Sequence, residues 1–189
     1  MNKYYCWTDG SLKGKVGKSS HGGWASIICD ENGKVIKELY SGHRNTTNNR
    51  EEIRGVLETL KYFKEPTELI ITSDSQYVVN TINEGWVRKW FDNKDYTKSN
   101  LDLWFELLDY LDFHKVTMVW TKGHATNELN NRVDELCQFA ANCLNLPEDE
   151  YTNNSEESGE PLVPESETQR SDGINTGSED RKITYSLGS

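Results

Sequence analysis

Short apolar stretches separated by turn-forming residues dominate the start of the chain, a pattern that is typical of β-strands. Strands are predicted over residues 3–8, 22–29 and 34–42. A polar loop is expected over 11–21, and Asp30-Glu31-Asn32-Gly33 suits a hairpin turn because Asn-Gly tolerates positive backbone φ angles. The chain is therefore expected to open with three antiparallel strands.

The apolar spacing then changes to that of helices and buried strands. Thr47 or Asn48 can cap a helix whose apolar residues recur about every 3.6 positions and which ends before Pro66. The continuous apolar run at 69–72 is typical of a central strand covered on both faces. Further segments predict helices through 77–82, 103–111 and 133–144 and a strand over 116–120. The predicted order of elements is βββαβααβα.

That order implies an α/β fold with a mixed five-stranded sheet and helices on both faces. Asp9 follows the first strand, and Asp74 follows the continuous apolar strand. If these two strands run parallel and side by side, both carboxylates lie at the sheet edge where such folds place their sites. Glu52 falls at the margin of the apolar stripe of the first helix, so its carboxylate is also expected to point towards the sheet edge.

Composition divides the chain near Pro147. Residues 147–189 hold three of the four prolines and are rich in Ser, Thr, Asn and Gly. Of the 31 acidic and 21 basic residues, this tail has 11 and 3, which leaves 20 and 18 in residues 1–146. The overall net charge of −10 therefore does not argue against a nucleic-acid partner. We expect one domain over 1–146 and a disordered acidic tail with no identified partner, because the tail buries too little apolar surface to offset its ordering entropy.

Four cysteines stand in the chain without C-x-x-C spacing. No apolar signal region is present, and no apolar run is long enough to span a membrane. We therefore expect reduced thiols in a cytoplasmic protein that has no membrane partner. We also expect a monomer.

Four acidic residues stand far apart in settings that a nuclease can use. They are Asp9 in W-T-D-G-S, Glu52 in T-T-N-N-R-E-E, Asp74 in T-S-D-S-Q-Y and Asp134 in R-V-D-E-L. Lys122-Gly123-His124 precedes the last of them. In content, order and spacing these segments resemble the type 1 ribonuclease H family over roughly residues 1 to 145. The resemblance implies an endoribonuclease that cuts the RNA strand of RNA–DNA hybrids and leaves 5′-phosphate and 3′-hydroxyl ends.

Clustered carboxylates repel one another unless they share protons or bind cations. Oxygen ligands alone suit Mg²⁺, or Mn²⁺, and argue against zinc. Two such ions about 3.5–4 Å apart can hold the attacking water and the leaving oxygen of a phosphodiester in line, which is the mechanism that the resemblance implies. The resemblance implies that Asp9 is a ligand of both ions. Glu52 and Asp74 are then ligands of one ion, and Asp134 is a ligand of the other. The matching histidine, His124, is expected to assist proton transfer or product release.

Three side chains beside these acids are not expected to be ligands. Cys137 lies on the same predicted helix as Asp134, where a small buried apolar side chain is the better interpretation. Glu51 and Glu135 are expected to face solvent, because successive residues of a helix point about 100° apart.

Short polar side chains and an aromatic cluster are expected to contact the hybrid. An enzyme of this kind must sense the 2′-hydroxyls of one strand. In the family, positions matching Asn48, Asn49 and Gln76 contact 2′-hydroxyls and bases, and Arg44 and Thr47 lie where a DNA phosphate can dock; caps and turns are their other interpretation. An aromatic and basic cluster resembles the family's substrate-handling protrusion and consists of Trp86, Arg88, Lys89, Trp90 and Phe91. The two tryptophans, four residues apart, can equally form one core face.

Two other functions remain open from the sequence. The first is a DNA-directed nuclease of the same broad fold, such as a junction resolvase or an integrase-like core, and Asn48, Asn49 and Gln76 count against it. The second is a non-catalytic hybrid-binding or assembly domain, and the four intact acidic residues count against that function alone.

Overall fold

A mixed five-stranded sheet forms the centre of the computed structural model, which describes residues 1–14, 20–123 and 127–149. Its strands are β1 (Lys3–Lys13), β2 (Ser20–Cys29), β3 (Val35–Thr46), β4 (Glu68–Ser73) and β5 (Lys115–Trp120). They lie in the order β3-β2-β1-β4-β5, with antiparallel pairing among β1, β2 and β3 and parallel pairing of β4 with β1 and β5. The sheet predicted from the sequence is thus confirmed.

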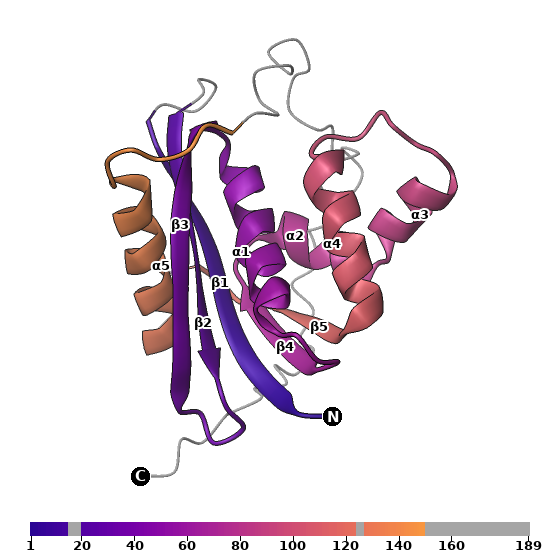
Figure 1. Ribbon diagram of the computed structural model, residues 1–189, viewed down its shortest axis with the longest axis horizontal. Coiled ribbons are helices and arrows are strands. Elements are labelled where there is room, and N and C mark those ends of the chain that lie inside the picture. The colour runs from indigo at the N-terminus through magenta and orange to yellow at the C-terminus, as the bar shows by residue number, and fades with distance from the viewer. Residues whose placement is uncertain (15–19, 124–126, 150–189) are drawn as a thin grey trace, which may run out of the picture.

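Helices cover both faces of this sheet (Figure 1). They are α1 (Asn48–Tyr62), α2 (Gln76–Asn83), α3 (Trp86–Asp92), α4 (Leu101–Phe113) and α5 (Glu128–Ala141). α5 packs on one face, and α1, α2 and α4 pack on the other. The short α3, which begins directly after Gly85 with its φ of 66°, is absent from the predicted order. No helix in the described ranges has the length and apolar character needed to cross a bilayer.

The alternation of side chains along the strands produces two apolar layers. Cys6 and Ile28 belong to a core shared with α1, α2 and α4, whereas their neighbours Trp7 and Ile27 pack towards α5. α5 lies unusually close to β2, since a Cβ added at Gly23 would meet the Cys137 carbonyl oxygen at 2.2 Å. A glycine at this position is therefore required for α5 to reach its place on the sheet.

The first strand is longer than the predicted one. β1 continues through Lys13, and the pairs from Ser11↔Gly23 to Lys13↔His21 bring both ends of the predicted loop at 11–21 into the sheet. The prediction was too short because main-chain pairing extends through polar residues that carry no apolar signal. As a result Asp9 lies within a strand rather than just after it.

The chain after α5 returns to the sheet. It crosses β3 near the start of α1 (Figure 1), where Arg44 N donates to Pro147 O at 2.8 Å and Asp149 N donates to Arg44 O at 2.9 Å. The side chain of Asp149 is buried. The predicted start of the tail at Pro147 therefore falls inside a packed segment, which we name the C-terminal segment (residues 147–149). The rest of the tail that was predicted to be disordered, residues 150–189, lies outside the described residues.

Candidate active site

Asp9 lies on β1 just beyond the last residue that pairs with β4. β1 pairs with β4 only from Lys3↔Glu68 to Trp7↔Thr72, but it remains paired with β2 as far as Lys13. Asp9 therefore lies where one neighbour of its strand has ended. It is 9% exposed, and Gly10 N donates to its Oδ1 at 2.9 Å.

Glu52 approaches Asp9 because α1 rests directly on β1. A Cβ added at Gly10 would lie 2.5 Å from the Glu52 nitrogen, so only glycine allows this contact. Asn48 Nδ2 donates to Glu52 Oε1 at 3.5 Å. Glu52 Oε2 is buried and has no hydrogen-bond partner within the described part of the chain. A buried carboxylate oxygen without a partner is costly, so this site calls for a proton or a cation.

Two more acidic side chains come from other elements. Asp74 follows β4 and precedes Ser75, whose side chain caps α2. The backbone oxygen of Asp74 accepts a hydrogen bond from Trp120 Nε1 at 3.1 Å. Asp134 lies on α5, where its Oδ1 accepts from Gln138 Nε2 at 2.9 Å.

Two sets of potential metal-ligand atoms share Asp9. Ligand atoms of Asp9, Glu52 and Asp74 all lie within 4.8 Å of one another, and so do those of Asp9, Asp134 and Cys137. The four predicted acidic residues thus converge on one place from β1, α1, α5 and the end of β4.

Burial and mutual repulsion oppose full ionisation of this cluster. Burial, followed by the charges of Asp74 and Asp134, raises the pKa of Asp9 from 3.8 to about 7. Burial, followed by the charges of Asp9 and Asp74, raises the pKa of Glu52 well above its usual value. A divalent cation would relieve both effects, since it replaces protons that the carboxyl groups otherwise retain. The oxygen-rich donor set fits a hard ion.

The acidic residues line a polar pocket of about 220 Å³. Its other lining residues are Gly10, Asn48, Asn130 and Asn131. The two asparagines of α5 were not predicted as site residues. Asn130 precedes Asp134 by one helical turn, so their shared helix face is the sequence signal that could have identified it.

The predictions for three side chains next to the acidic residues had different outcomes. Cys137 is buried in the apolar layer with Val133 and Leu136, as predicted, although it also reaches the ligand set with Asp9. Glu135 is exposed, as predicted. The prediction for Glu51 was wrong, because it is fully buried. Its rotation around α1 brings it to Arg54 and the end of β3 rather than to solvent.

The predicted hybrid contacts divide into two regions. Near the pocket, Thr47, Asn48 and Gln76 are exposed at the starts of α1 and α2, and Asn49 is partly exposed. Thr47 is also the cap of α1, because its side chain accepts from Arg50 N. In the same region, the exposed Arg44 pairs with Glu148 at 3.4 Å.

The second region is α3, which lies beyond α4 from the sheet (Figure 1) and does not line the pocket. Trp90 packs against the core and Trp104, with ring centroids 6.4 Å apart. Trp86 is partly exposed beside Trp90, and Lys89 is exposed. The core interpretation therefore holds for Trp90, and the substrate role of α3 stays a prediction. His124 lies outside the described residues, so its role also stays a prediction.

Comparisons with known proteins agree on one family. The profile of the ribonuclease H family, RNase H, matches residues 1–142. Ribonuclease H of Chlorobium phaeovibrioides is 40% identical over 143 residues, which cover 73% of this chain and 94% of that protein. Ribonuclease H of a Thermoanaerobacter species is 43% identical over 136 residues, covering 69% and 84%.

Solved structures give the same result for the fold. LC9-RNase H1, a type 1 RNase H with the type 2 active-site motif, aligns with a TM-score of 0.67 and 25% identity over 75% of this chain and 72% of that one. LC11-RNase H1, solved with an RNA/DNA hybrid, aligns with a TM-score of 0.56 and 22% identity over 73% and 96%. With its sequence, its sheet order and its convergent acidic residues in agreement, this chain belongs to the ribonuclease H family.

Proposed function

We propose that this chain cleaves the RNA strand of RNA–DNA hybrids by two-metal-ion hydrolysis, leaving 5′-phosphate and 3′-hydroxyl ends. Membership of a metal-dependent nuclease family supports the activity. The observation that carries the mechanism is the position of Asp9 in both sets of ligand atoms. Asp9 would accordingly hold both ions, with Glu52 and Asp74 holding one of them and Asp134 the other.

Mg²⁺ is the proposed ion, with Mn²⁺ as an alternative, because carboxylate oxygens are hard ligands. Bound ions would neutralise the carboxylates, activate the attacking water and stabilise the leaving oxygen. The chain itself supplies the arrangement: Gly10 admits α1 to β1, and Asn48 holds one oxygen of Glu52. The strongest support for a cation at this point is Oε2 of Glu52, which is buried and has no hydrogen-bond partner among the residues that the structure describes.

Recognition of the hybrid is proposed at the first turns of α1 and α2. Asn48 supports this role because it is exposed and lines the acidic pocket. A nucleotide that bonds to its amide would therefore bring a neighbouring phosphate close to the acids. Asn49 and Gln76 are proposed to contact bases and 2′-hydroxyls, and Arg44 and Thr47 a DNA phosphate.

Two further roles belong to this proposal. His124 assists proton transfer or product release, because an imidazole titrates near neutral pH. The exposed Lys89 and the partly exposed Trp86 form a second contact for the hybrid away from the pocket, supported by their aromatic and basic character.

The proposal is tested with a labelled RNA–DNA hybrid beside DNA and RNA duplexes of the same sequence, first with Mg²⁺ and then with EDTA. We expect cleavage of the hybrid alone, and only with metal. Equal cleavage of duplex DNA would favour a DNA-directed nuclease. Hybrid binding without cleavage would favour a non-catalytic domain.

A matched pair of variants tests the ligand assignment. Asp134→Asn and Glu135→Gln each remove one negative charge from α5, but only Asp134 lines the pocket. We expect the first variant to lose cleavage and the second to retain it. Equal losses would contradict the assignment of Asp134.

We also propose that the enzyme acts as a monomer in the cytoplasm. The four cysteines are free thiols, which suits a reducing compartment. Light scattering after size-exclusion chromatography tests the monomer, and a concentration-dependent dimer mass would contradict it.

A further inference from the structure

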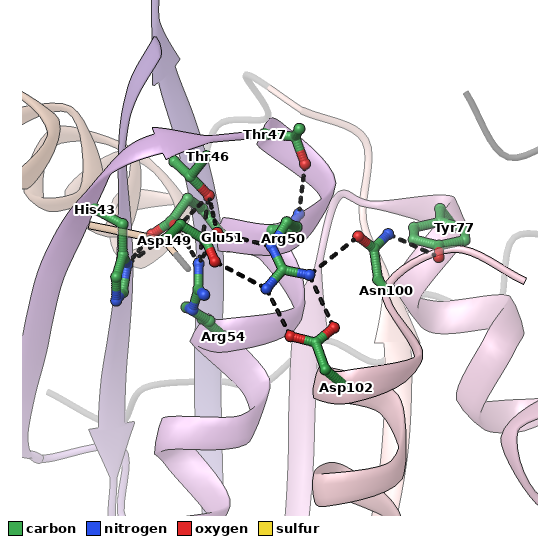
Figure 2. Close-up of polar contacts among 10 residues, drawn as sticks. All are labelled: His43, Thr46, Thr47, Arg50, Glu51, Arg54, Tyr77, Asn100, Asp102 and Asp149. Carbon is green, nitrogen blue, oxygen red and sulfur yellow. Dashed lines mark hydrogen bonds and ion pairs between the residues drawn. The ribbon is translucent and has the colours of Figure 1, made fainter. Parts of the chain in front are cut away.

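A network of ionic side chains, all buried except Asp102, surrounds the start of α1 (Figure 2). Arg50, which is 2% exposed, and Arg54 contribute its positive charges. Glu51, Asp102 and Asp149 contribute the negative charges. Arg50 and Arg54 each stand two residues from Glu52, which turns them about 200° around the helix from that carboxylate. The network therefore holds the side of α1 opposite to the acidic pocket.

Arg50 is fixed between two carboxylates from distant parts of the chain. Its Nη1 and Nη2 donate to Asp102 Oδ1 and Oδ2 at 2.9 and 2.7 Å. Its Nε and Nη2 donate to Asp149 Oδ2 and Oδ1 at 2.7 and 2.9 Å. Paired hydrogen bonds of this kind restrict the guanidinium in both position and orientation. Through them α1 is joined to α4 and to the C-terminal segment.

Asp149 extends the network from Arg50 to the end of β3. Its Oδ2 accepts from Arg54 Nη1 at 2.9 Å and from the Thr46 hydroxyl at 2.8 Å. Burial opposes ionisation of this carboxyl, but the hydrogen bonds from Arg54 and Arg50 hold its pKa well below the usual value. Asp149 therefore remains charged, and it meets both arginines of the helix from a position 99 residues beyond Arg50.

We infer that Asp149 is a positioning residue for the nuclease reaction: through Arg50 and Arg54 it sets the depth and rotation of the first turns of α1, and with them Glu52 and Asn48. The geometry supports this role because α1 has contacts on two opposite sides at this level. On one side Gly10 allows the backbone of Glu52 to rest on β1, and on the other Asp149 prevents the helix from moving away. The inference depends on the proposed role of Glu52 as a metal ligand.

The inference is tested with Asp149→Asn in the full-length chain. The amide keeps the shape of the side chain but removes the charge that orients both arginines. We expect a weaker response to Mg²⁺, measured as a half-saturating concentration about tenfold higher, since loss of groups that orient metal ligands has effects of this size. Calorimetric titration of Mg²⁺ into the folded variant provides a second measurement that does not depend on activity. All measurements are made well below the melting temperature of the variant.

A matched control separates positioning from stability alone. Thr59→Val removes a buried 2.6 Å hydrogen bond with Ser26 from the same helix, about two turns beyond Glu52. This control should lower the melting temperature without changing the response to Mg²⁺. If Asp149→Asn also changes only the melting temperature, Asp149 has no positioning role.

A milder variant covers the case in which Asp149→Asn fails to fold. Asp102→Asn removes the more exposed partner of Arg50 and should shift the Mg²⁺ response in the same direction by a smaller factor. An unchanged response in a folded Asp102→Asn variant would overturn the inference. If the wild-type protein does not cleave the hybrid, the proposed function is contradicted. Failure of the proposed function is therefore distinguishable from failure of the inference about Asp149.

Discussion

The thiol of Cys137 donates a hydrogen bond to the carboxylate of Asp9, with 3.6 Å between Sγ and Oδ2. Burial, followed by the charges of Asp9 and Asp134, holds the pKa of this thiol well above its usual value. At neutral pH the thiol is therefore an uncharged donor beside a set of hard oxygen ligands. Softer metal ions favour sulfur ligands, so Cys137 gives the site a ligand for ions other than Mg²⁺.

We expect Cd²⁺ to inhibit Mg²⁺-dependent cleavage more strongly in the wild type than in Cys137→Ala. The reason is that Sγ and oxygens of Asp9 and Asp134 lie within 4.8 Å of one another, close enough to share one ion. Inhibition curves and the ultraviolet absorption of a cadmium–thiolate bond provide the measurement. Cys143→Ala, which removes a thiol outside this set, is the control and should behave like the wild type. Identical inhibition of all three proteins would exclude a sulfur contact.

In metal-free protein, stability should fall as the pH rises from about 4 to about 7. The pKa of Asp9 is 3.8 in its ordinary state and about 7 in the fold, so over this range the folded protein holds a proton that the unfolded chain has released. Urea unfolding in EDTA at several pH values measures the effect. Asp9→Asn should flatten the dependence of stability on pH. In the wild type, saturating Mg²⁺ should restore the stability that is lost near pH 7. A wild-type profile no steeper than that of Asp9→Asn would contradict the shift.

His124→Ala should slow turnover without abolishing it, and less than Asp9→Asn does. Metal ions supply the main activation of the attacking water in the proposed mechanism, whereas His124 only moves a proton or aids release. Single-turnover rates on the hybrid at several pH values measure the difference. Equal losses in the two variants would give His124 an essential role.

Two truncations should differ sharply although their ends are three residues apart. A chain that ends at Asp149 should keep its fold and its cleavage activity. A chain that ends at Leu146 lacks the buried partner of Arg50 and Arg54, and losing one member of a buried ion pair costs about 3–5 kcal/mol. Thermal and urea unfolding measure the gap. Equal stability of the two chains would show that the C-terminal segment contributes nothing to the fold.

Removing only residues 150–189 should tighten hybrid binding at low salt. These residues hold 9 acidic and 3 basic side chains, a net charge of −6, which repels phosphate. Comparing KM of the full chain and the chain ending at Asp149 at about 50 and about 200 mM salt tests this, because screening should reduce the gain. An unchanged KM at both concentrations would mean that the tail does not affect binding.

Elements defined by local patterns were predictable from the sequence. The helix cap at Thr47 and the buried strand before Asp74 are set by residues within a few positions of each other. The convergence of Asp9 and Asp74 followed from strand order, because neighbouring parallel strands end at the same edge of a sheet. The approach of Glu52 followed from its place at the margin of the apolar stripe of its helix. Asp134 required the resemblance to a known family, since nothing in its own surroundings distinguishes it from Glu135.

Features that depend on distant partners were not predictable. Asp149 stands in a segment whose composition indicates disorder, and its burial is decided by Arg50, 99 positions earlier. The burial of Glu51 likewise depends on the end of β3, which the predicted strand at 34–42 did not reach. α3 was missed because its 7 residues are fewer than the window over which an apolar period is established.

Because the chain returns to β3, a label joined after residue 149 would start from a defined place on the protein. Asp149 bonds to Thr46, one residue before the turn that is proposed to hold the hybrid. The N-terminus lies at the opposite end of β1 from the start of α1 (Figure 1). A fluorophore or affinity tag joined directly after residue 149 would therefore be tethered beside the nucleic acid, whereas the same group on the N-terminus would report from the far end of the sheet.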